Sequence, residues 1–194
     1  TMNKLLLVAL EEEFDADLLP EDWQVVYTGV GKVNATLHIC ESIGLFQPDY
    51  IVNYGTAGGL NGASGLLEMK AFVQRDMIAE PLCERGYTPG ETGAIITTNA
   101  GIGIGNVCAT GDSFVTQEDP WLTSLKVDCV DMEGYALAKV CKYAEIPFRS
   151  WKYISDSADE NASDDWDANA GKGQMQFLSE VILGEFGSVR RFYH

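Results

Sequence analysis

The stretch Val130-Asp-Met-Glu-Gly-Tyr-Ala136 marks a change from a strand to a helix, and it decides how the chain around it folds. Residues 126–130 form a short, mainly apolar run that is typical of a strand, while residues 133–145 repeat apolar side chains at helical spacing. Glu133 therefore lies in the predicted first turn, where the helix dipole favours an acidic side chain. Taken alone, this position is explained by helix stability, without any functional role for Glu133.

Three other segments place polar groups at the ends of predicted strands. They are Ala9-Leu-Glu-Glu-Glu-Phe14, Gly55-Thr-Ala-Gly-Gly-Leu60 and Tyr153-Ile-Ser-Asp-Ser-Ala-Asp159. In open α/β sheets, ligands bind outside the carboxyl ends of the strands, where loops meet and helix N-termini point inward. All four polar segments fall at such ends. Their shared position favours a common functional site over a separate structural explanation for each segment.

Apolar runs and helical patterns alternate along the chain, and this alternation predicts an α/β fold, namely a three-layer α/β/α sandwich with a central mixed sheet. The predicted strands cover residues 5–10, 24–28, 50–53, 94–98, 107–110, 127–130 and 148–154. The predicted helices cover residues 32–46, 133–145 and 166–186. No change of composition marks a linker within the 194 residues, so we expect a single domain over 1–194.

The composition argues against several classes of partner. The net charge of −16 opposes binding to polyanions, and the basic residues form no stripe, so we expect neither nucleic acid nor a membrane surface as a partner. The apolar run at residues 2–10 is too short to span a bilayer and is interpreted as the first strand. We therefore expect a soluble, cytoplasmic protein that binds a small molecule.

The cysteines and histidines argue against a disulfide framework and a structural zinc site. Of the five cysteines, Cys40, Cys108, Cys129 and Cys141 lie in apolar stretches, which favours reduced thiols in the core. There is no Cys-x-x-Cys pair, and the two histidines at positions 38 and 194 are far apart in the sequence. We expect no metal site.

Two glycine-containing segments resemble parts of phosphate loops. Gly29-Val-Gly31-Lys32 precedes a predicted helix, but it lacks the glycine spacing and the Lys-Ser/Thr ending of a P-loop. We interpret it as a tight turn, with anion binding as the alternative. Gly101-Ile-Gly-Ile-Gly105 is interpreted as a flexible loop before a strand, because its spacing differs from the dinucleotide-binding pattern.

Six segments, taken in their order along the chain, resemble the nucleoside phosphorylase superfamily. They are residues 9–14, 29–33, 55–60, 111–114, 130–136 and 154–159. Within the superfamily, the sequence is most similar to the 5′-methylthioadenosine/S-adenosylhomocysteine nucleosidases, and the similarity covers nearly the whole chain. The resemblance implies a phosphorylase/hydrolase-like fold that cleaves a purine N-glycosidic bond through an oxocarbenium-like state.

The resemblance implies roles for three carboxyl groups. Glu13 matches the general base that orients and deprotonates the attacking water. Glu133 matches the residue that accepts hydrogen bonds from the ribose 2′ and 3′ hydroxyls, a task that suits its two acceptor oxygens. Asp156 matches the acid that donates to N7 of the leaving purine, for which its pKa must be raised. Glu11 and Glu12 are interpreted as a solvated acidic turn.

The remaining predicted contacts surround the substrate. Phe114 matches the aromatic residue that stacks on adenine, and the backbone of Val115 is expected to contact the edge of the base. Trp166 falls where the family places an aromatic residue against the 5′ side. Thr56 replaces a serine that is common in the family and keeps a hydroxyl near the attacking water. The other substrate-binding residues that we predict are Met132 in the ribose pocket, Ser155 beside Asp156, and Ala57 beside Thr56.

The expected nucleophile is water, because phosphate requires arginines or lysines around it. Asn53 and Tyr54 stand before Gly55, where hexameric phosphorylases carry an arginine, and the N-terminal loop supplies glutamates that repel phosphate. The favoured function is therefore hydrolysis of a 5′-modified adenosine to adenine. A phosphate-dependent phosphorylase and a non-catalytic nucleoside-binding relative are the alternatives.

Neither a metal nor an organic cofactor is expected, because protonation of the base and carboxylate stabilisation of the sugar supply the activation. The family is usually dimeric, so the resemblance also implies a homodimer.

Overall fold

The computed structural model describes residues 2–100 and 105–188, whose strands form one mixed sheet. The strands are β1 (Lys4–Val8), β2 (Trp23–Tyr27), β3 (Tyr50–Gly59), β4 (Leu66–Gln74), β5 (Ile95–Thr97), β6 (Asn106–Thr110), β7 (Cys129–Asp131) and β8 (Phe148–Asp156). The helices are α1 (Lys32–Phe46), α2 (Pro120–Ser124), α3 (Gly134–Ala144), α4 (Ala162–Asn169), α5 (Gln174–Phe177) and α6 (Phe186–Ser188), with a 3-10 turn η1 (Ala16–Leu18) and a π-helical segment η2 (Leu178–Glu185). In the described part of the chain, every helix is too short or too polar to cross a membrane.

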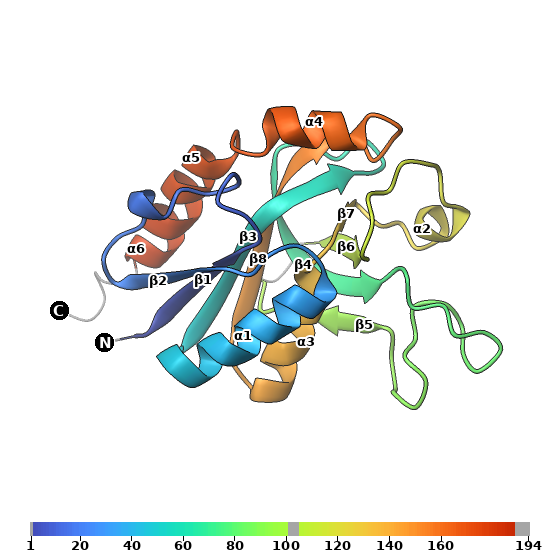
Figure 1. Cartoon of the computed structure of the whole chain (residues 1–194), viewed down its shortest axis with the longest axis horizontal. Helices are drawn as coiled ribbons and strands as arrows, with labels where there is room; N and C mark the ends of the chain where they lie inside the picture. The colour runs from blue at the N-terminus through green and yellow to red at the C-terminus, as the bar shows by residue number, and fades with distance from the viewer. Residues whose placement is uncertain (1, 101–104, 189–194) are drawn as a thin grey trace.

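Helices lie on both sides of the sheet, which confirms the predicted α/β fold. Helices α1 and α3 lie side by side on one face, and α4, α5 and α6 follow the other (Figure 1). Alternate side chains of β1 belong to the two resulting cores, with Leu5 and Leu7 in one and Leu6 and Val8 in the other. A strand that is buried on both faces is apolar at consecutive positions, as β1 is.

Five of the strands close into a ring. β3 pairs with both β7 and β8, β7 pairs with β6, β6 pairs with β4, and β4 returns to β8. Strands β2 and β1 extend the sheet beyond β3, and β5 extends it beyond β4. The pairing register of β3 with β8 shifts near the end of both strands, so that Gly58 pairs with Asp156 and Ser155 is the extra residue of a bulge.

The structure corrects the predicted elements in two places. Strand β4 was not predicted, because its apolar run contains Glu68, which is buried only because Arg149 donates to both carboxylate oxygens. The predicted helix 166–186 is wrong: α4 begins at Ala162 and ends at Asn169, and α5 starts after a turn. At Gly173, just before α5, a Cβ atom would lie 2.3 Å from the Tyr153 ring, so this close approach requires glycine.

Smaller corrections concern single residues. Glu133 precedes α3 at the N-cap position and does not cap the helix with its side chain. Cys40 is exposed and is not a core thiol, whereas Cys108, Cys129 and Cys141 are buried, and all five cysteines are free. The predicted loop at residues 101–105 falls, except for its last residue, outside the described residues, as does His194.

Candidate active site

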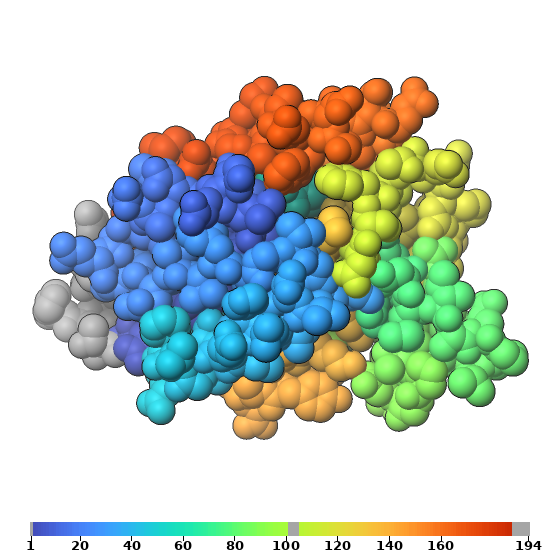
Figure 2. All heavy atoms as spheres, in the orientation of Figure 1, coloured from blue at the N-terminus to red at the C-terminus, as the bar shows by residue number. Residues whose placement is uncertain are grey.

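A cavity of about 390 Å³ opens where the ends of several strands meet. Figure 2 shows its opening as a hollow where the blue N-terminal part, the yellow-green segment after β6 and the orange α4 come together. All ten residues predicted for the site line this cavity. They are Glu13, Thr56, Ala57, Phe114, Val115, Met132, Glu133, Ser155, Asp156 and Trp166.

Glu13 lies in the turn after β1, and its carboxylate is held by three donors. Oε2 accepts hydrogen bonds from the amide and the hydroxyl of Thr56 at 2.7 and 2.8 Å, and Oε1 accepts one from the amide of Leu10 at 3.2 Å. The side chain is buried, and burial raises the pKa of Glu13 above its usual value, although the Thr56 bonds limit the rise. By contrast, Glu11 and Glu12 are exposed, as expected for a solvated turn.

A short chain of hydrogen bonds extends from Glu13 to α4. The Thr56 hydroxyl donates to Glu13 and accepts a hydrogen bond of 2.8 Å from the indole Nε1 of Trp166. The hydroxyl therefore has both its donor and its acceptor function used. The Trp166 ring, which is in the second turn of α4 and not at its start, is thereby fixed against the end of β3.

Glu133 approaches the cavity from the start of α3. Its Oε2 accepts a hydrogen bond of 2.9 Å from the amide of Gly31, the residue that precedes α1. Burial, and next the neighbouring carboxylate of Asp131, raise the pKa of Glu133 to about 8. The residue is 8% exposed, so its carboxylate is largely removed from solvent.

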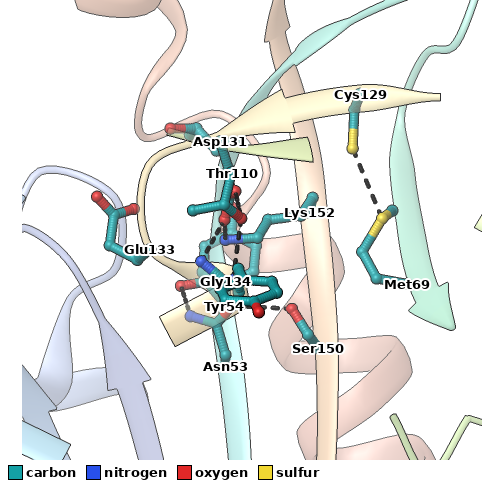
Figure 3. Close-up of polar contacts among 12 residues, drawn as sticks. Asn53, Tyr54, Met69, Thr110, Cys129, Asp131, Glu133, Gly134, Ser150 and Lys152 are labelled. Atoms are coloured by element: carbon teal, nitrogen blue, oxygen red, sulfur yellow. Dashed lines mark hydrogen bonds and ion pairs between the residues drawn. The ribbon is translucent and has the colours of Figure 1, made fainter. Parts of the chain in front are cut away.

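Asp131 and Lys152 form a buried ion pair beside Glu133. The ammonium Nζ of Lys152 lies 2.9 Å from Oδ2 of Asp131, and both side chains have at most 1% exposure. Figure 3 shows the pair between β7 and β8, with Glu133 to one side. Asp131 also accepts hydrogen bonds from the hydroxyl of Thr110 and the amide of Gly134.

The ion pair favours the charged forms of both Asp131 and Lys152. Burial by itself raises the pKa of Asp131, but the Lys152 ammonium and the donated hydrogen bonds outweigh it and lower the pKa. Burial acts to lower the pKa of Lys152, yet Asp131 and Glu133 raise it above its usual value. Neither residue was predicted to have a role. The sequence does hold a sign of the pair, because each is a charged residue within an apolar strand. A buried charge in such a strand needs a partner.

Asp156 reaches the cavity through the bulge at the end of β8. Its Oδ2 accepts a hydrogen bond of 3.0 Å from the Ser155 hydroxyl, and its Oδ1 accepts one of 2.8 Å from the amide of Ala158. Burial raises the pKa of Asp156, although these bonds oppose the rise. On β3, a Cβ atom at Gly58 would lie 2.7 Å from Oδ1 of Asp156, so only glycine leaves room for the carboxyl group in this place.

The loop after β6 forms another wall of the cavity. Phe114 is 44% exposed and is therefore not a core residue. Arg75, at the end of β4, holds the loop from behind, because its guanidinium donates to the carbonyl oxygens of Gly111 and Ser113 and to the Ser113 hydroxyl. It also donates to the carbonyl of Asp131, which joins the loop to β7. Arg75 lines the cavity and was not predicted.

The turn before α1 binds carboxylates of the protein itself. Gly29 and Gly31 have φ angles of 75° and 95°, which confirms the tight turn. At the N-terminus of α1, the amide of Gly31 donates to Glu133, and the amide of Lys32 donates to Oδ1 of Asp112 at 2.8 Å. The Lys32 ammonium is 2.7 Å from Asp76. The amides at the positive end of the α1 dipole thus bind carboxylates of the protein itself.

The arrangement brings three carboxyl groups with raised pKa values to one small cavity. Such a cavity is suited to chemistry that needs a base to take a proton, an acid that keeps one near neutral pH, and an acceptor for neighbouring hydroxyls. The partly exposed rings of Phe114 and Trp166 give it two aromatic walls.

The chain is similar to known proteins in sequence and in fold. A family model described as the phosphorylase superfamily matches residues 80–182. The 5′-methylthioadenosine/S-adenosylhomocysteine nucleosidase of Buchnera aphidicola subsp. Schizaphis graminum (strain Sg) is 30% identical over 167 residues, which cover 75% of this chain and 71% of that protein.

Two solved structures from Helicobacter pylori have the same fold. Futalosine hydrolase of strain 26695 has a TM-score of 0.82 and 26% identity, over 92% of this chain and 96% of that one. A 5′-methylthioadenosine/S-adenosylhomocysteine nucleosidase in complex with an aminopyrrolopyrimidine–pyrrolidine ligand has a TM-score of 0.82 and 26% identity, over 92% and 97%.

Proposed function

The chain belongs to the phosphorylase superfamily, and from this premise we propose that it is a purine nucleosidase. Its reaction is hydrolysis of the N-glycosidic bond of a 5′-modified adenosine, such as 5′-methylthioadenosine or S-adenosylhomocysteine, to adenine and the ribose product. The observation that carries the proposal is the buried carboxylate of Glu13, which three donors hold at the wall of the cavity that Glu133 and Asp156 also line.

Glu13 is the proposed base for the attacking water. Its carboxylate has fixed donors on one side and the cavity on the other, so it can accept a proton from a water molecule placed next to the sugar. Desolvation raises its pKa and so makes it a stronger base than a solvated glutamate.

Asp156 and Glu133 act on the two halves of the substrate. With its pKa raised by burial, Asp156 can keep a proton and donate it to N7, so that adenine leaves as a neutral base. Glu133 accepts hydrogen bonds from the 2′ and 3′ hydroxyls, and its negative charge, when ionised, favours the developing positive charge of the sugar ring. Phe114 supplies a face for the base, and Met132 lines the ribose pocket.

Hydrolysis is favoured over phosphorolysis because the lysines near the cavity, among the described residues, are ion-paired, and the guanidinium of Arg75 is turned to the backbone of the loop after β6. Arg75 donates to backbone carbonyls, Lys152 is paired with Asp131, and Lys32 is paired with Asp76. The amides at the start of α1, which would suit an anion, donate to carboxylates. A phosphate ion would be repelled by the carboxylate of Glu13, and among the described residues of the cavity lining Arg75 alone carries a positive charge.

We also propose a homodimer that forms across a groove between α1 and α3. Three apolar residues next to the groove or in its wall are well exposed: Val33 at 78%, Leu37 at 53% and Tyr143 at 72%. A patch of this kind on two neighbouring helices is suited to a symmetric contact with a second copy. The groove is lined by Lys32, Thr36, Cys40, Ile43, Gln74, Met77, Thr88, Tyr135, Ala136, Lys139, Val140, Tyr143 and Ala144.

One chromatographic experiment tests the function. The protein is incubated with 5′-methylthioadenosine, S-adenosylhomocysteine, adenosine, inosine and deoxyadenosine, with and without phosphate, and the released base is quantified. We expect adenine from the 5′-modified adenosines in the absence of phosphate, and Asp156→Asn should lower the turnover sharply while the fold is kept. Adenine release that depends on phosphate would contradict the role of Glu13, and ligand binding without any release would indicate a binding protein.

A further inference from the structure

The loop after β6, residues 111–116, borders the cavity but has little backbone support. It contributes Ser113, Phe114 and Val115 to the lining, and Figure 2 shows it in yellow-green beside the hollow. Residues 112–116 make no backbone–backbone hydrogen bond with any other described residue. The Val115 side chain packs against a small apolar cluster, but Phe114 is 44% exposed. The position of the Phe114 ring therefore depends on side chains that reach the loop from other elements.

Two consecutive residues directly after β4 hold this loop. The guanidinium of Arg75 donates to the carbonyl oxygens of Gly111 and Ser113 and to the Ser113 hydroxyl. The Asp76 carboxylate accepts a hydrogen bond of 2.8 Å from the amide of Asp112. At Gly111 a Cβ atom would lie 2.8 Å from Cζ of Arg75, so the guanidinium packs directly on the loop backbone. Three successive loop residues are thus tied to the end of one strand.

The buried charge of Arg75 is used almost entirely on this loop. The residue is 5% exposed, and in the part of the chain that the structure describes it forms no ion pair. A buried guanidinium is usually neutralised by a carboxylate, because an unpaired charge is costly to remove from water. The guanidinium of Arg75 donates instead to the loop and to the carbonyl of Asp131 in β7. Such a use of a buried cation indicates that the loop must be held in one place.

Resting on the nucleosidase function proposed above, in which the base stacks on Phe114, we propose that Arg75 is a positioning residue for the purine. It acts through the loop, by holding the Phe114 ring where the base can stack on it, and takes no part in bond cleavage. Stacking is present both in the bound substrate and in the transition state. Arg75 therefore contributes to substrate binding more than to turnover.

Steady-state kinetics of Arg75→Met with 5′-methylthioadenosine test this role. We expect KM to rise by about tenfold, the scale of losing one base–aromatic stack, while kcat stays within about threefold of the wild type. Arg149→Met is the matched control, because it removes the same side chain from an ion pair with Glu68 and does not line the cavity. It should lower the Tm and leave KM unchanged.

A second pair of variants distinguishes positioning from a general loss of structure. If Arg75 acts through the aromatic ring, Arg75→Met should raise KM by less than about twofold in the Phe114→Ala background. Arg75→Lys replaces Arg75→Met if the latter does not fold. A single ammonium cannot bond all of these oxygens at once, so Arg75→Lys should still raise KM, although by less.

Calorimetric titration with adenine gives the same comparison as a change in Kd, without any need for turnover. A wild-type KM and Kd in the folded Arg75 variant would overturn this inference, and so would an equal rise of KM with and without the Phe114 ring. A wild-type protein that binds adenine but releases none from any nucleoside would instead count against the nucleosidase function alone.

Discussion

Thr56 joins two parts of the cavity wall through a single hydroxyl group. That hydroxyl donates to Glu13 and accepts from Trp166, while the Thr56 amide makes a second bond to Glu13. The resemblance to the nucleoside phosphorylases predicted a hydroxyl near the attacking water. The structure adds that the same hydroxyl orients the proposed base and an aromatic wall.

Replacing Thr56 by valine should therefore impair catalysis more than folding. The hydrogen bond from the Thr56 hydroxyl lowers the pKa of Glu13, so its loss should raise that pKa further. Because the base must be ionised, the acid limb of the pH profile of kcat should move to higher pH, and kcat should fall by about tenfold or more. Thr56→Ser keeps the hydroxyl and is the control. An unshifted pH profile in Thr56→Val would contradict this account of Glu13.

Glu133 should make the stability of the protein dependent on pH. Its pKa is about 8 in the folded chain, against an ordinary value of 4.5, so the folded state binds this proton more tightly than the unfolded state. The contribution is therefore fully present below about pH 4.5 and is lost as the pH rises through about 8. Glu133→Gln should have a higher Tm than the wild type at pH 9, with a much smaller difference at pH 5.

Thermal unfolding followed by circular dichroism at both pH values would measure this difference. Glu160→Gln is the control, because Glu160 is exposed and should show no such pH-dependent gain. A gain for Glu133→Gln that is equal at both pH values would show that the carboxyl group is not the cause.

The predicted site residues all came together, yet the buried pair of Asp131 and Lys152 was not predicted. The motifs of the family predict residues that contact a substrate, whereas Asp131 is bound to Lys152, Thr110 and Gly134 of the protein itself. Each stands in an apolar strand, but nothing in a single sequence states which strands are neighbours. The partner of a buried charge becomes visible only with the pairing of the strands.

At the scale of elements, the bulge at the end of β8 directs Ser155 and Asp156 to the cavity. The shifted register places Asp156 next to Gly58 of β3, where no side chain could fit. The bulge thus depends on both strands, and glycine at position 58 is part of the site although it has no side chain.

The change Gly58→Ala should displace the Asp156 carboxyl group. The new Cβ would lie 2.7 Å from its Oδ1 and 3.1 Å from Ala158 Cβ, so one of them must move. We expect kcat to fall by about tenfold or more while the protein still folds, because a small displacement of a catalytic group is costly. Gly62→Ala is a control of the same type, since a Cβ atom there has no neighbour within 4 Å, although its φ of 78° adds strain. Equal kcat losses in the two variants would argue against a specific effect on Asp156.

Periodicity predicted the two long helices and the first strand, and it failed where contacts between elements decide. Helices α1 and α3 and the buried strand β1 follow directly from their apolar spacing. Strand β4 was missed because Arg149 neutralises its Glu68 from another strand. The turn between α4 and α5 includes Gly173, which packs closely on the Tyr153 ring. In both cases the deciding residue is distant in sequence.

At the scale of the whole molecule, the ring of five strands is held partly by the Asp131–Lys152 pair, which links β7 to β8 across the ring. Lys152→Met should lower the free energy of unfolding by about 3–5 kcal/mol, because it leaves the Asp131 charge buried without its partner. Urea unfolding at pH 7 would measure the change.

The double variant Asp131→Asn/Lys152→Met provides the control for that prediction. If the cost comes from an unpaired charge, the double variant should lose less stability than the sum of the two single variants. Additive losses would mean that the two groups do not depend on each other.

The proposed homodimer can be tested by light scattering. We expect a mass of twice the 21.2 kDa of one chain, and a variant Tyr143→Glu, which places a charge on the exposed patch, should shift the mass toward that of one chain. Circular dichroism would verify that the variant remains folded. A wild-type protein that is monomeric at micromolar concentration would contradict the proposal.

The carboxylates at the start of α1 also bear on how chemistry can change during evolution within this fold. Asp112 and Glu133 occupy the amides that an incoming phosphate would use, and Glu13 adds a further negative charge in the same cavity. Neutralising Asp112 alone would free one amide and still leave a phosphate facing both glutamates. A lineage that exchanged water for phosphate would therefore need several coordinated substitutions.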